Sequence, residues 1–459
     1  MQGKKYLTFT YGCQMNERDS EAMAGLLEEM GFEPARRPEE ADLILVNTCA
    51  VRERAENKVF GKLGELRALK SARPELIIGV AGCMVQREGM AQKIRQLAPH
   101  VDLIIGTHAL HRLPELVREV ERTRRTRVAV IPAAAAPLTE LPVKRSDKIR
   151  AYVNVSYGCN NFCTYCIVPY VRGPERSRQP EDILREVRSL AAAGYREVTL
   201  LGQNVNSYGR DLAKPITFGD LLKLVDRVEG LARIRFTTSH PRDFSHELIE
   251  IIARSEKVCE HFHLPAQAGS DRILALMGRG YTRTHYLELA RAIRTRLPEA
   301  TITTDLIVGF PGESEEDFAA TLDLVEQVRF DAAFTFIYSP RPGTAAANLP
   351  DQVPAAVKRE RLARLNQLQY RFTRESNERL VGRVVEVLVE GRSKTNPERL
   401  TGRTRTNKVV VFSGPEEMIG RLVPLRITAA QTFNLFGETL EDEAISEETR
   451  APEAGSGGR

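Results

Sequence analysis

Three cysteines in one short loop are the residues of this chain best suited to bind a metal. Cys159, Cys163 and Cys166 follow one another at CxxxCxxC spacing in the segment GCNNFCTYC. Iron–sulfur clusters are usually held by four cysteine thiolates, so a local motif of three would leave one iron of a four-iron cluster open. A structural zinc site is the alternative, but such sites usually pair CxxC halves and fill all four positions. The spacing therefore favours an iron–sulfur cluster.

A second set of cysteines is spread along the N-terminal part of the chain. Cys13, Cys49 and Cys83 stand in the segments TYGCQMN, NTCAVRE and GCMVQ, 34 to 36 residues apart, and each follows a predicted strand. The carboxyl ends of parallel strands lie at one edge of a sheet, so the three thiols can converge there. One such cysteine alone would be interpreted as a small buried hydrophobe. Three at the same structural position predict a second three-thiolate cluster.

The composition sets limits on the class of protein. Seven cysteines in 459 residues make a poor disulfide framework, and Cys259 has no partner at ligand spacing and is assigned to packing. Without an apolar signal core or a membrane-spanning run, we expect a cytoplasmic protein with no membrane partner. The net charge is +5, but residues 438–459 carry seven acidic and two basic side chains, which leaves about +10 on the rest. That surplus is compatible with nucleic acid without requiring it.

The first part of the chain alternates short apolar strands with helical segments. This pattern predicts an N-terminal parallel α/β domain over residues 4–120. The predicted strands are 6–11, 42–47, 76–81 and 101–105, and the predicted helices are 16–30, 51–69 and 86–97. Residues 121–147 are predicted to be a linker because their second half is rich in Ala and Pro.

A second alternating series predicts a partial (β/α)6 barrel over residues 148–377. Its predicted strands are 151–157, 197–201, 233–237, 260–264, 301–308 and 332–338. The active sites of β/α barrels lie at the carboxyl ends of the strands. The CxxxCxxC loop directly follows the first strand and is therefore expected on that face.

The last segments change to short β-rich runs separated by Gly and Pro. They predict a small antiparallel β-barrel over residues 378–440, followed by a disordered acidic tail over 441–459. The barrel carries six basic candidates for binding RNA phosphates: Arg392, Lys394, Arg399, Arg403, Arg405 and Lys408. A solvated charged face is the other interpretation of these residues.

Taken together, these motifs resemble the radical S-adenosylmethionine (SAM) methylthiotransferases. The CxxxCxxC loop after the first barrel strand is typical of radical SAM enzymes, and the N-terminal triad is similar to the methylthiotransferase N-terminal domain. The last β segment resembles a TRAM domain, an RNA-binding barrel. The resemblance covers about residues 4–437. The motifs TYGCQMN, NTCAVRE, GCNNFCTYCIVP and GQNVNSY are most similar to the bacterial members that modify tRNA.

The resemblance implies two [4Fe–4S] clusters and SAM as cofactors. Cys159, Cys163 and Cys166 would hold the cluster whose open iron chelates SAM, and one electron would cleave SAM to methionine and a 5′-deoxyadenosyl radical. The other triad would hold an auxiliary cluster that carries or donates sulfur. The electron would come from a reductant protein such as flavodoxin or ferredoxin, and the sulfur donor is not identified.

The resemblance also assigns six residues to the SAM pocket. These are Tyr165 inside the cluster loop, four residues at or beyond strand ends, Gln203, Asn204, Ser239 and Gln267, and Asp305 in the segment TTDLIVGFPGE, which resembles the family's adenosine-contacting strand. A hydrogen bond within a turn is the ordinary alternative for each polar residue alone. The segment HLPAQAGS departs from the family's usual HLPVQSGS at Ala266 and Ala268, which weakens the assignment of contacts there.

The implied reaction is methylthiolation of carbon 2 of N(6)-dimethylallyl(isopentenyl)adenosine in tRNA, next to the anticodon. The target base would have to leave its stack, which an anticodon loop makes easier. Within the family the alternatives are the same chemistry on threonylcarbamoyl-adenosine or on a ribosomal protein. Outside it, the alternative is an RNA-binding protein with structural metal sites.

Overall fold

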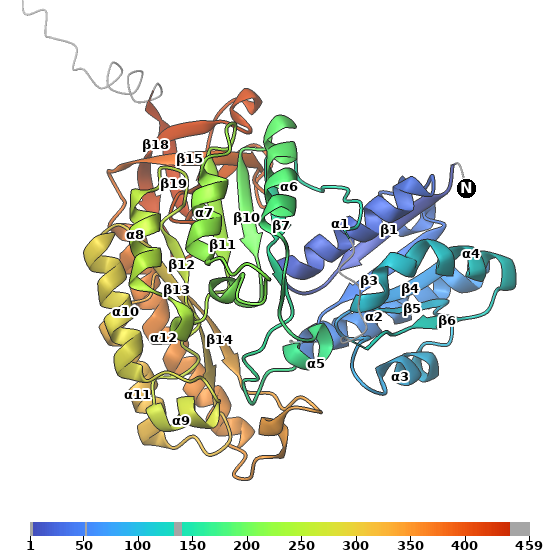
Figure 1. The fold of residues 1–459 in the computed structure, drawn as a ribbon, viewed down its shortest axis with the longest axis horizontal. Helices are drawn as coiled ribbons and strands as arrows, with labels where there is room; N and C mark the ends of the chain where they lie inside the picture. Colours follow the sequence, from blue (N-terminus) through green and yellow to red (C-terminus); the bar gives the residue numbers. More distant parts are fainter. Residues whose placement is uncertain (1–2, 51–52, 133–139, 441–459) are drawn as a thin grey trace, which may run out of the picture.

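The computed structural model describes residues 3–50, 53–132 and 140–440, which form three bodies along the chain (Figure 1). The N-terminal domain lies on one side of a larger central barrel, and a small C-terminal barrel sits at one end of that central barrel. The predicted acidic tail at 441–459 lies outside the described residues. No helix in the described ranges is long and apolar enough to cross a membrane.

The N-terminal domain is built on one parallel sheet, as predicted. Its strands are β1 (Lys5–Thr10), β2 (Glu33–Pro34), β3 (Leu43–Thr48), β4 (Ile77–Gly82), β5 (Leu103–Gly106) and β6 (Arg127–Ala129), in the order β2-β1-β3-β4-β5-β6. Strands β3 and β4 are buried at every position because helices cover both faces of the sheet. The strand order reverses between β1 and β3, and the carboxyl ends at such a point are where ligands bind in open α/β sheets.

This domain differs from the prediction at three places: the third helix begins later, a fourth helix was not predicted, and a strand lies inside the predicted linker. The helices are α1 (Gln14–Glu29), α2 (Glu53–Ala72), α3 (Met90–Leu97) and α4 (Leu113–Thr123), with a 3-10 turn η2 (Thr107–Arg112). The third helix was predicted from residue 86 but begins after Gly89, whose φ of +71° is not helical. Strand β6 lies inside the predicted linker, because a short β run precedes the Ala/Pro-rich part and pairs with β5.

The central domain is the predicted six-stranded half-open barrel. Its strands are β7 (Arg150–Asn154), β10 (Glu197–Leu201), β11 (Arg233–Thr237), β12 (His261–His263), β13 (Thr301–Val308) and β14 (Ala332–Ile337). They form two parallel three-stranded sheets, β7-β10-β11 and β12-β13-β14, which a parallel bridge between Ile234 and Val258 joins. Strands β7 and β14 are thus the two outer strands.

Helices cover the outside of this barrel and bury its apolar core. They are α6 (Pro180–Ala192), α7 (Phe218–Asp226), α8 (His246–Arg254), α10 (Arg283–Arg296), α11 (Glu315–Val328) and α12 (Ala355–Glu378). Shorter elements border the strand ends: α5 (Val168–Arg172), α9 (Asp271–Leu276), and the pair β8 (Ser156–Tyr157) and β9 (Arg176–Ser177). The remaining 3-10 turns are η1 (Pro38–Glu40), η4 (Val205–Ser207), η5 (Pro241–Asp243), η6 (Ala345–Asn348) and η7 (Glu416–Met418).

The C-terminal domain is a closed five-stranded barrel. Its strands are β15 (Val384–Arg392), β16 (Leu400–Thr404), β17 (Val409–Phe412), β18 (Leu422–Ala430) and β19 (Leu435–Thr439). The predicted antiparallel pairing is found between all neighbours except β17 and β19, which are parallel. This barrel docks on the amino ends of the central strands, where Arg233, the first residue of β11, donates to the Arg403 carbonyl oxygen at 2.6 Å and Arg235 donates to that of Thr404 at 2.7 Å.

Candidate functional site

The CxxxCxxC cysteines lie in the loop between β8 and α5, on the carboxyl side of the central strands. Cys159 and Cys163 are buried, with 8% and 7% exposure, and Cys166 is half-buried. The Cys159 amide donates to the Gly173 carbonyl oxygen at 3.0 Å, and the Cys166 amide donates to that of Cys163 at 2.9 Å. These backbone bonds close the loop into a compact turn.

Backbone conformation at two residues of this loop explains why the sequence folds here. Gly158 has a φ of +71°, and a Cβ at this position would lie 2.0 Å from the Pro174 carbonyl oxygen. Only glycine fits both conditions. Phe162 has a φ of +38°, which is rare for a residue with a side chain. The loop therefore stores backbone strain immediately before Cys163.

The structure brings the three N-terminal cysteines together at the carboxyl edge of their sheet. Cys13 is the N-cap of α1, Cys49 follows β3 and Cys83 follows β4. The thiols of Cys13 and Cys83 lie 3.7 and 3.9 Å from the same atom, Asn16 Oδ1. A Cβ on Gly12 would lie 2.8 Å from the Cys49 Cβ, so Cys49 packs directly on the turn that carries Cys13.

Asn16 organises this edge and was not identified from the sequence. It is fully buried, and its Nδ2 donates to the Thr48 carbonyl oxygen at 2.8 Å and to that of Tyr11 at 3.3 Å. These bonds tie the end of β1 to the end of β3. Its place three residues after Cys13 in TYGCQMN was the only available signal.

The short helix α5 connects the two cysteine sets. It begins two residues after Cys166, and Ile167 and Val171 pack in one apolar cluster with Ala50 and Cys83. The segment that carries the CxxxCxxC triad thus continues directly onto the N-terminal triad. Figure 1 shows α5 at the junction of the central barrel and the N-terminal domain.

Arg172, the last residue of α5, contacts the N-terminal triad. Its Nε donates to the Cys83 sulfur at 3.0 Å, and its Nη2 donates to Asp19 at 2.6 Å and to Asn16 Oδ1 at 3.3 Å. Burial opposes the charge of Arg172, but Asp19 and Cys83 outweigh it, so its pKa is raised. No sequence pattern indicated that a residue of one domain would contact a cysteine of the other.

Arg279 occupies the equivalent position beside the loop triad. Its Nη1 donates to the Cys163 sulfur at 3.3 Å and to the Tyr165 hydroxyl at 3.4 Å, and its Nη2 donates to the Pro265 carbonyl oxygen at 2.8 Å. Only 4% of Arg279 is exposed. Each triad therefore has one buried guanidinium next to one of its sulfurs.

The donor sets suit iron–sulfur clusters. Burial raises the pKa of Cys83 and Cys159 to about 11 and that of Cys166 to about 12, so these thiols need a metal to become thiolates. In the described ranges, no group of three His, Cys, Asp or Glu side chains is placed to hold a single metal ion. Iron–sulfur clusters are bound by cysteine thiolates, and each of the two sets supplies three cysteines.

The residues predicted for SAM lie at the carboxyl ends of the central strands, in different surroundings. Ser239 and Gln267 are buried, and Ser239 Oγ and Gln267 Oε1 have no hydrogen-bond partner among the described atoms. Gln203 is half-buried after β10. Asn204 is used within the fold, since its Nδ2 donates to Asp243 at 2.8 Å and its Oδ1 accepts from the His240 amide at 3.2 Å.

Asp305 belongs to the inner wall formed by β12, β13 and β14. His263 Nε2 lies 3.6 Å from an Asp305 carboxylate oxygen, and Thr303 Oγ1 lies 3.1 Å from His263 Nδ1. Phe334, 58% exposed, packs edge to face on His263. Asp305 was predicted from the sequence. Its neighbours His263, Thr303 and Phe334, and the buried Asn206, whose amide atoms lack partners among the described residues, were missed because strand alternation alone does not separate lumen from core.

Polar atoms without partners are the places where a polar cofactor fits. Ser239 Oγ, Gln267 Oε1 and the Asn206 amide offer both donors and acceptors at the strand ends. SAM carries an amine, a carboxylate and a ribose that can bond to such groups. Ala266 and Ala268, where the family usually has larger or hydroxylated residues, are both 1% exposed, so they serve packing.

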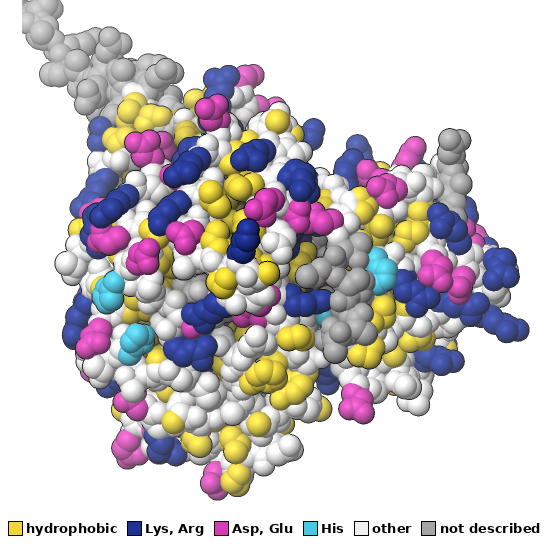
Figure 2. Space-filling model, in the orientation of Figure 1, with side chains coloured by type: hydrophobic (Ala, Val, Ile, Leu, Met, Phe, Trp, Pro, Cys, Tyr) yellow, Lys and Arg dark blue, Asp and Glu magenta, His cyan; other side chains and the backbone are white. Residues whose placement is uncertain are grey.

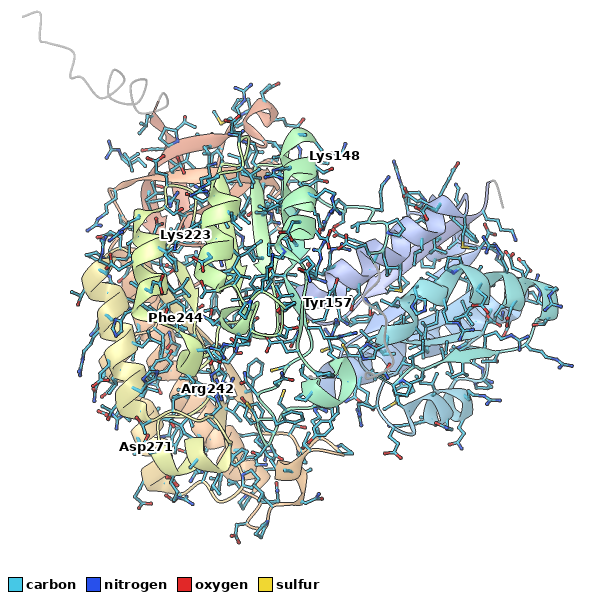
Figure 3. All side chains as sticks on the ribbon, viewed as in Figure 1. Lys148, Tyr157, Lys223, Arg242, Phe244 and Asp271 are labelled. Carbon is cyan, nitrogen blue, oxygen red and sulfur yellow. The ribbon has the colours of Figure 1, made fainter. Side chains whose placement is uncertain are left out.

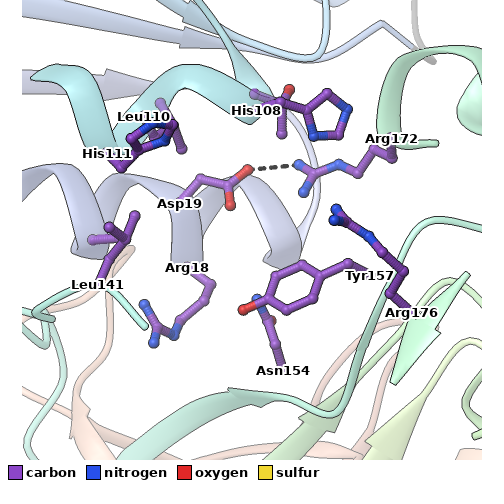
Figure 4. A pocket seen from close by; sticks show the side chains of 12 residues that line it. Arg18, Asp19, His108, Leu110, His111, Leu141, Asn154, Tyr157, Arg172 and Arg176 are labelled. Atoms are coloured by element: carbon purple, nitrogen blue, oxygen red, sulfur yellow. Dashed lines mark hydrogen bonds and ion pairs between the residues drawn. The ribbon is translucent and has the colours of Figure 1, made fainter. Parts of the chain in front are cut away.

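A basic cavity of about 100 Å³ lies between the N-terminal domain and the central barrel. Arg18 and Asp19 of α1 face Tyr157 and Arg176 across it, and the Asp19–Arg172 ion pair forms part of its wall (Figure 4). Figure 3 shows Tyr157 at the junction of the two domains. The cavity thus adjoins the arginine that contacts Cys83.

The basic residues predicted for RNA divide into two groups. Arg392, Lys394 and Arg399 are exposed on the small barrel. Arg405 pairs with Glu260 at 2.6 Å, and Lys408 donates to Ser376 Oγ at 2.8 Å and Asn377 Oδ1 at 2.7 Å, so both hold the domains together. Arg403 pairs with Glu390 at 3.2 Å. On the face in Figure 2, positive and negative side chains are interspersed.

Comparison with known proteins defines the class. Sequence models match the Radical SAM superfamily over residues 153–325 and the TRAM domain over 378–440, and residues 5–106 match Uncharacterized protein family UPF0004. A solved structure of the radical S-adenosylmethionine methyltransferase TsrM from Kitasatospora setae aligns with a TM-score of 0.55 at 15% identity, covering 75% of each chain. That similarity supports the fold alone. The chain is a radical SAM protein.

Curated relatives identify the family. The chain is 59% identical over 438 residues to the tRNA-2-methylthio-N(6)-dimethylallyladenosine synthase of Moorella thermoacetica, which covers 95% of this chain and 99% of that protein. It is 55% identical to the synthase of Geobacillus kaustophilus, covering 96% of this chain and 83% of that protein. The chain belongs to the family of these synthases, the radical SAM methylthiotransferases. The resemblance predicted from the motifs is confirmed, and the family's cofactors are SAM and [4Fe–4S] clusters.

Proposed function

We propose that this protein is a tRNA methylthiotransferase that adds a methylthio group to carbon 2 of N(6)-dimethylallyladenosine next to the anticodon. The observation that carries this proposal is the meeting of two separate cysteine triads through α5 in a chain that matches such synthases over 95% of its length. One triad alone would suit many radical reactions. A second triad, one helix away, suits a reaction that also transfers sulfur.

The ligands follow from this arrangement. Cys159, Cys163 and Cys166 would hold the cluster that binds SAM, and Cys13, Cys49 and Cys83 would hold the auxiliary cluster. When bound, the clusters and SAM supply reductive cleavage of SAM and the sulfur and methyl group of the product. Each triad would provide three thiolates to a four-iron cluster, which would leave one iron of each cluster without a cysteine ligand.

The chain's own residues position and shield this chemistry. Arg279 and Arg172 place a fixed positive charge beside Cys163 and Cys83, which balances the negative charge of the bound thiolates. Ser239, Gln267 and Asn206 offer SAM hydrogen bonds at the strand ends, with Asp305 on the inner wall, Gln203 beside them and Tyr165 in the loop. Asn204 holds the loop after β10 in place through Asp243.

The partner is tRNA, and its anticodon loop must reach the carboxyl ends of the central strands. The exposed Arg392, Lys394 and Arg399 of the small barrel would contact phosphates of a more distant part of the tRNA, since that barrel sits at the amino ends of those strands. A flavodoxin- or ferredoxin-like protein would supply the electron. The proposed place of work is the cytoplasm, where tRNA is found.

The test of the proposal is made in a bacterial host that lacks its own synthase. We expect 2-methylthio-N(6)-dimethylallyladenosine to appear in digested tRNA when this gene is expressed, as detected by mass spectrometry of nucleosides. A methylthio group on threonylcarbamoyl-adenosine, or on a ribosomal protein with tRNA unchanged, would move the proposal to another member of the family. No methylthio product on any of these would contradict it.

A further inference from the structure

Two large aromatic side chains are exposed on the segment that joins the cysteine triads. Phe162, between Cys159 and Cys163, is 58% exposed, and Tyr170 on α5 is 53% exposed. Their rings contact each other edge to face, with centroids 6.2 Å apart and an interplanar angle of 81°. Exposed aromatic rings lose the stabilisation that burial would provide, so an exposed pair at this position indicates a binding surface.

The backbone keeps Phe162 in this exposed position. Its φ of +38° is unfavourable for a residue with a Cβ, and such strain clusters at functional sites. The neighbouring Asn161 accepts a hydrogen bond from Arg242 at 2.6 Å, and the Thr164 amide donates to the Met277 carbonyl oxygen at 3.0 Å. Both sides of Phe162 are thus fixed to other parts of the barrel (Arg242 is labelled in Figure 3).

The packing of α5 against the N-terminal domain determines where the pair of rings lies. Ile167 and Val171 pack against Cys83 and Ala50 of the N-terminal domain, while Tyr170 between them stays exposed and meets Phe162. The two rings therefore lie on the short stretch of chain between one triad and the other. A molecule that rests on them lies on the CxxxCxxC loop and on the exposed face of the helix that contacts Cys83.

We propose that Phe162 and Tyr170 form a stacking platform for an unpaired base of the anticodon loop, next to the target adenosine. The inference rests on the proposed tRNA substrate. Two rings expose too little apolar surface for a protein interface, which needs on the order of 1,000 Å². A single flat base matches one ring face, and aromatic side chains are what RNA-binding proteins use to hold bases that leave the stack.

The test measures binding of an anticodon stem–loop RNA that contains N(6)-isopentenyladenosine to the anaerobically reconstituted protein. Phe162→Ala is expected to raise the dissociation constant about tenfold, the usual effect of losing one base–aromatic stack. Phe162→Tyr, which keeps a ring, should stay within about twofold of the wild type, and Tyr170→Ala should weaken binding less than Phe162→Ala. Iron content is measured on the same samples, so a damaged loop is recognised by its missing iron.

The matched control is Leu97→Ala, because Leu97 is 62% exposed at the end of α3, on the opposite edge of the N-terminal sheet. It should bind as the wild type does. The effect of Phe162→Ala should also be the same at low and high salt, since stacking releases no counterions. A loss of affinity that disappears at high salt would contradict stacking.

A second arm identifies the base. Stem–loops with an abasic site at each loop position in turn are compared between the wild type and Phe162→Ala, as a double-mutant cycle. At one position the cost of Phe162→Ala should disappear, because the stacking base is absent. Equal binding of wild type and Phe162→Ala to the intact stem–loop would overturn the platform and leave the proposed function standing. No binding by the wild type would overturn both.

Discussion

Each cysteine triad has a buried arginine within hydrogen-bond distance of one sulfur. Arg172 lies 3.0 Å from the Cys83 sulfur and Arg279 lies 3.3 Å from that of Cys163. Hydrogen bonds and positive charge at the ligand sulfurs are among the factors that set the potential of an iron–sulfur cluster. The two sites therefore share a design at the scale of single residues, although they belong to different folds.

Replacing one cysteine in each triad should separate two functions. We expect Cys163→Ala to abolish SAM cleavage and Cys49→Ala to keep some cleavage but form no methylthio product, because each change removes a different cluster. Iron per chain, about eight in the wild type with two four-iron clusters, should fall to about four in both. High-performance liquid chromatography of 5′-deoxyadenosine and of digested tRNA checks both. Methylthiolated product from Cys49→Ala would show that its triad is not the auxiliary site.

A glycine substitution tests the geometry of the loop. Gly158→Ala forces a Cβ to within 2.0 Å of the Pro174 carbonyl oxygen at a φ of +71°. We expect the loop to shift and the protein to bind about half of its iron, since only the loop triad is disturbed. Gly194→Ala is the matched control, because Gly194 has a φ of +89° with nothing within 4 Å of the added Cβ. It should cost only about 1 kcal/mol of stability and no iron.

At the scale of elements, α5 performs two tasks. Its start is fixed by the CxxxCxxC loop, and its end places Arg172 against Cys83 and Asp19. One helix of five residues thus fixes the relation between the two triads. A movement of the CxxxCxxC loop on binding SAM would therefore also move Arg172 relative to Cys83.

The element-scale prediction concerns Arg172. We expect Arg172→Gln to make the auxiliary cluster harder to reduce, because a donor and a positive charge next to Cys83 are lost. If the reduced cluster loses about 1.4 kcal/mol of stabilisation relative to the oxidised cluster, the reduction potential of a one-electron couple falls by about 59 mV. The measurement is a redox titration followed by electron paramagnetic resonance, with the barrel cluster as internal reference.

Two further variants separate an effect on the cluster from an effect on the domain junction. Arg145→Gln is the matched control, because Arg145 also lies at the domain junction, with 9% of its side chain exposed, and bonds to Glu21 at 2.9 Å, but no described contact joins it to a sulfur. It should lower the melting temperature and leave the potential unchanged. Adding Asp19→Asn to Arg172→Gln removes the carboxylate that would be left without its partner. An unchanged potential in Arg172→Gln would show that the arginine only holds the domains together.

At the scale of the whole molecule, the two smaller domains attach to different parts of the central barrel, the N-terminal domain at its side and the TRAM barrel at one end (Figure 1). The N-terminal domain meets it through α5, on the side of the CxxxCxxC loop, and the TRAM barrel meets the amino ends of the strands through Arg235 and Arg405. The chemistry and the RNA-binding barrel are therefore separated by the length of the central strands. A tRNA bound to both would have to extend along the side of the molecule.

Two arginines of the TRAM barrel should behave differently. Arg399→Gln is expected to weaken binding of full-length tRNA and to lower the salt dependence by about one phosphate contact, without changing the melting temperature, because Arg399 is exposed. Arg405→Gln should lower the melting temperature, because it breaks the contacts with Glu260 and with the Val258 carbonyl oxygen at 2.9 Å. Binding at several salt concentrations and thermal unfolding check this pair. Equal effects of both changes on tRNA binding would contradict the assignment of Arg399 to RNA binding and of Arg405 to the domain interface.

The amino-acid sequence by itself determined the class of chemistry. Cysteine spacing is a local property of the chain, so CxxxCxxC could be interpreted without a fold, and three cysteines after three strands implied a shared edge because parallel strands end on the same side. The β/α alternation similarly determined the two larger domains, since apolar periodicity reflects burial. The boundary at β6 was missed because three residues of strand carry too little pattern.

Tertiary structure alone decided which residues serve the triads and how the domains meet. Arg172, Asn16 and Arg279 are separated from cysteines they contact by up to 116 residues. No local sequence pattern indicates that a buried arginine will donate a hydrogen bond to a cysteine sulfur. The same holds for Arg405 and Lys408. Their charges suggested binding to RNA, but their side chains contact Glu260 and Ser376 of the central domain. Spacing along the chain determines which groups are available, and packing between distant segments determines which of them meet.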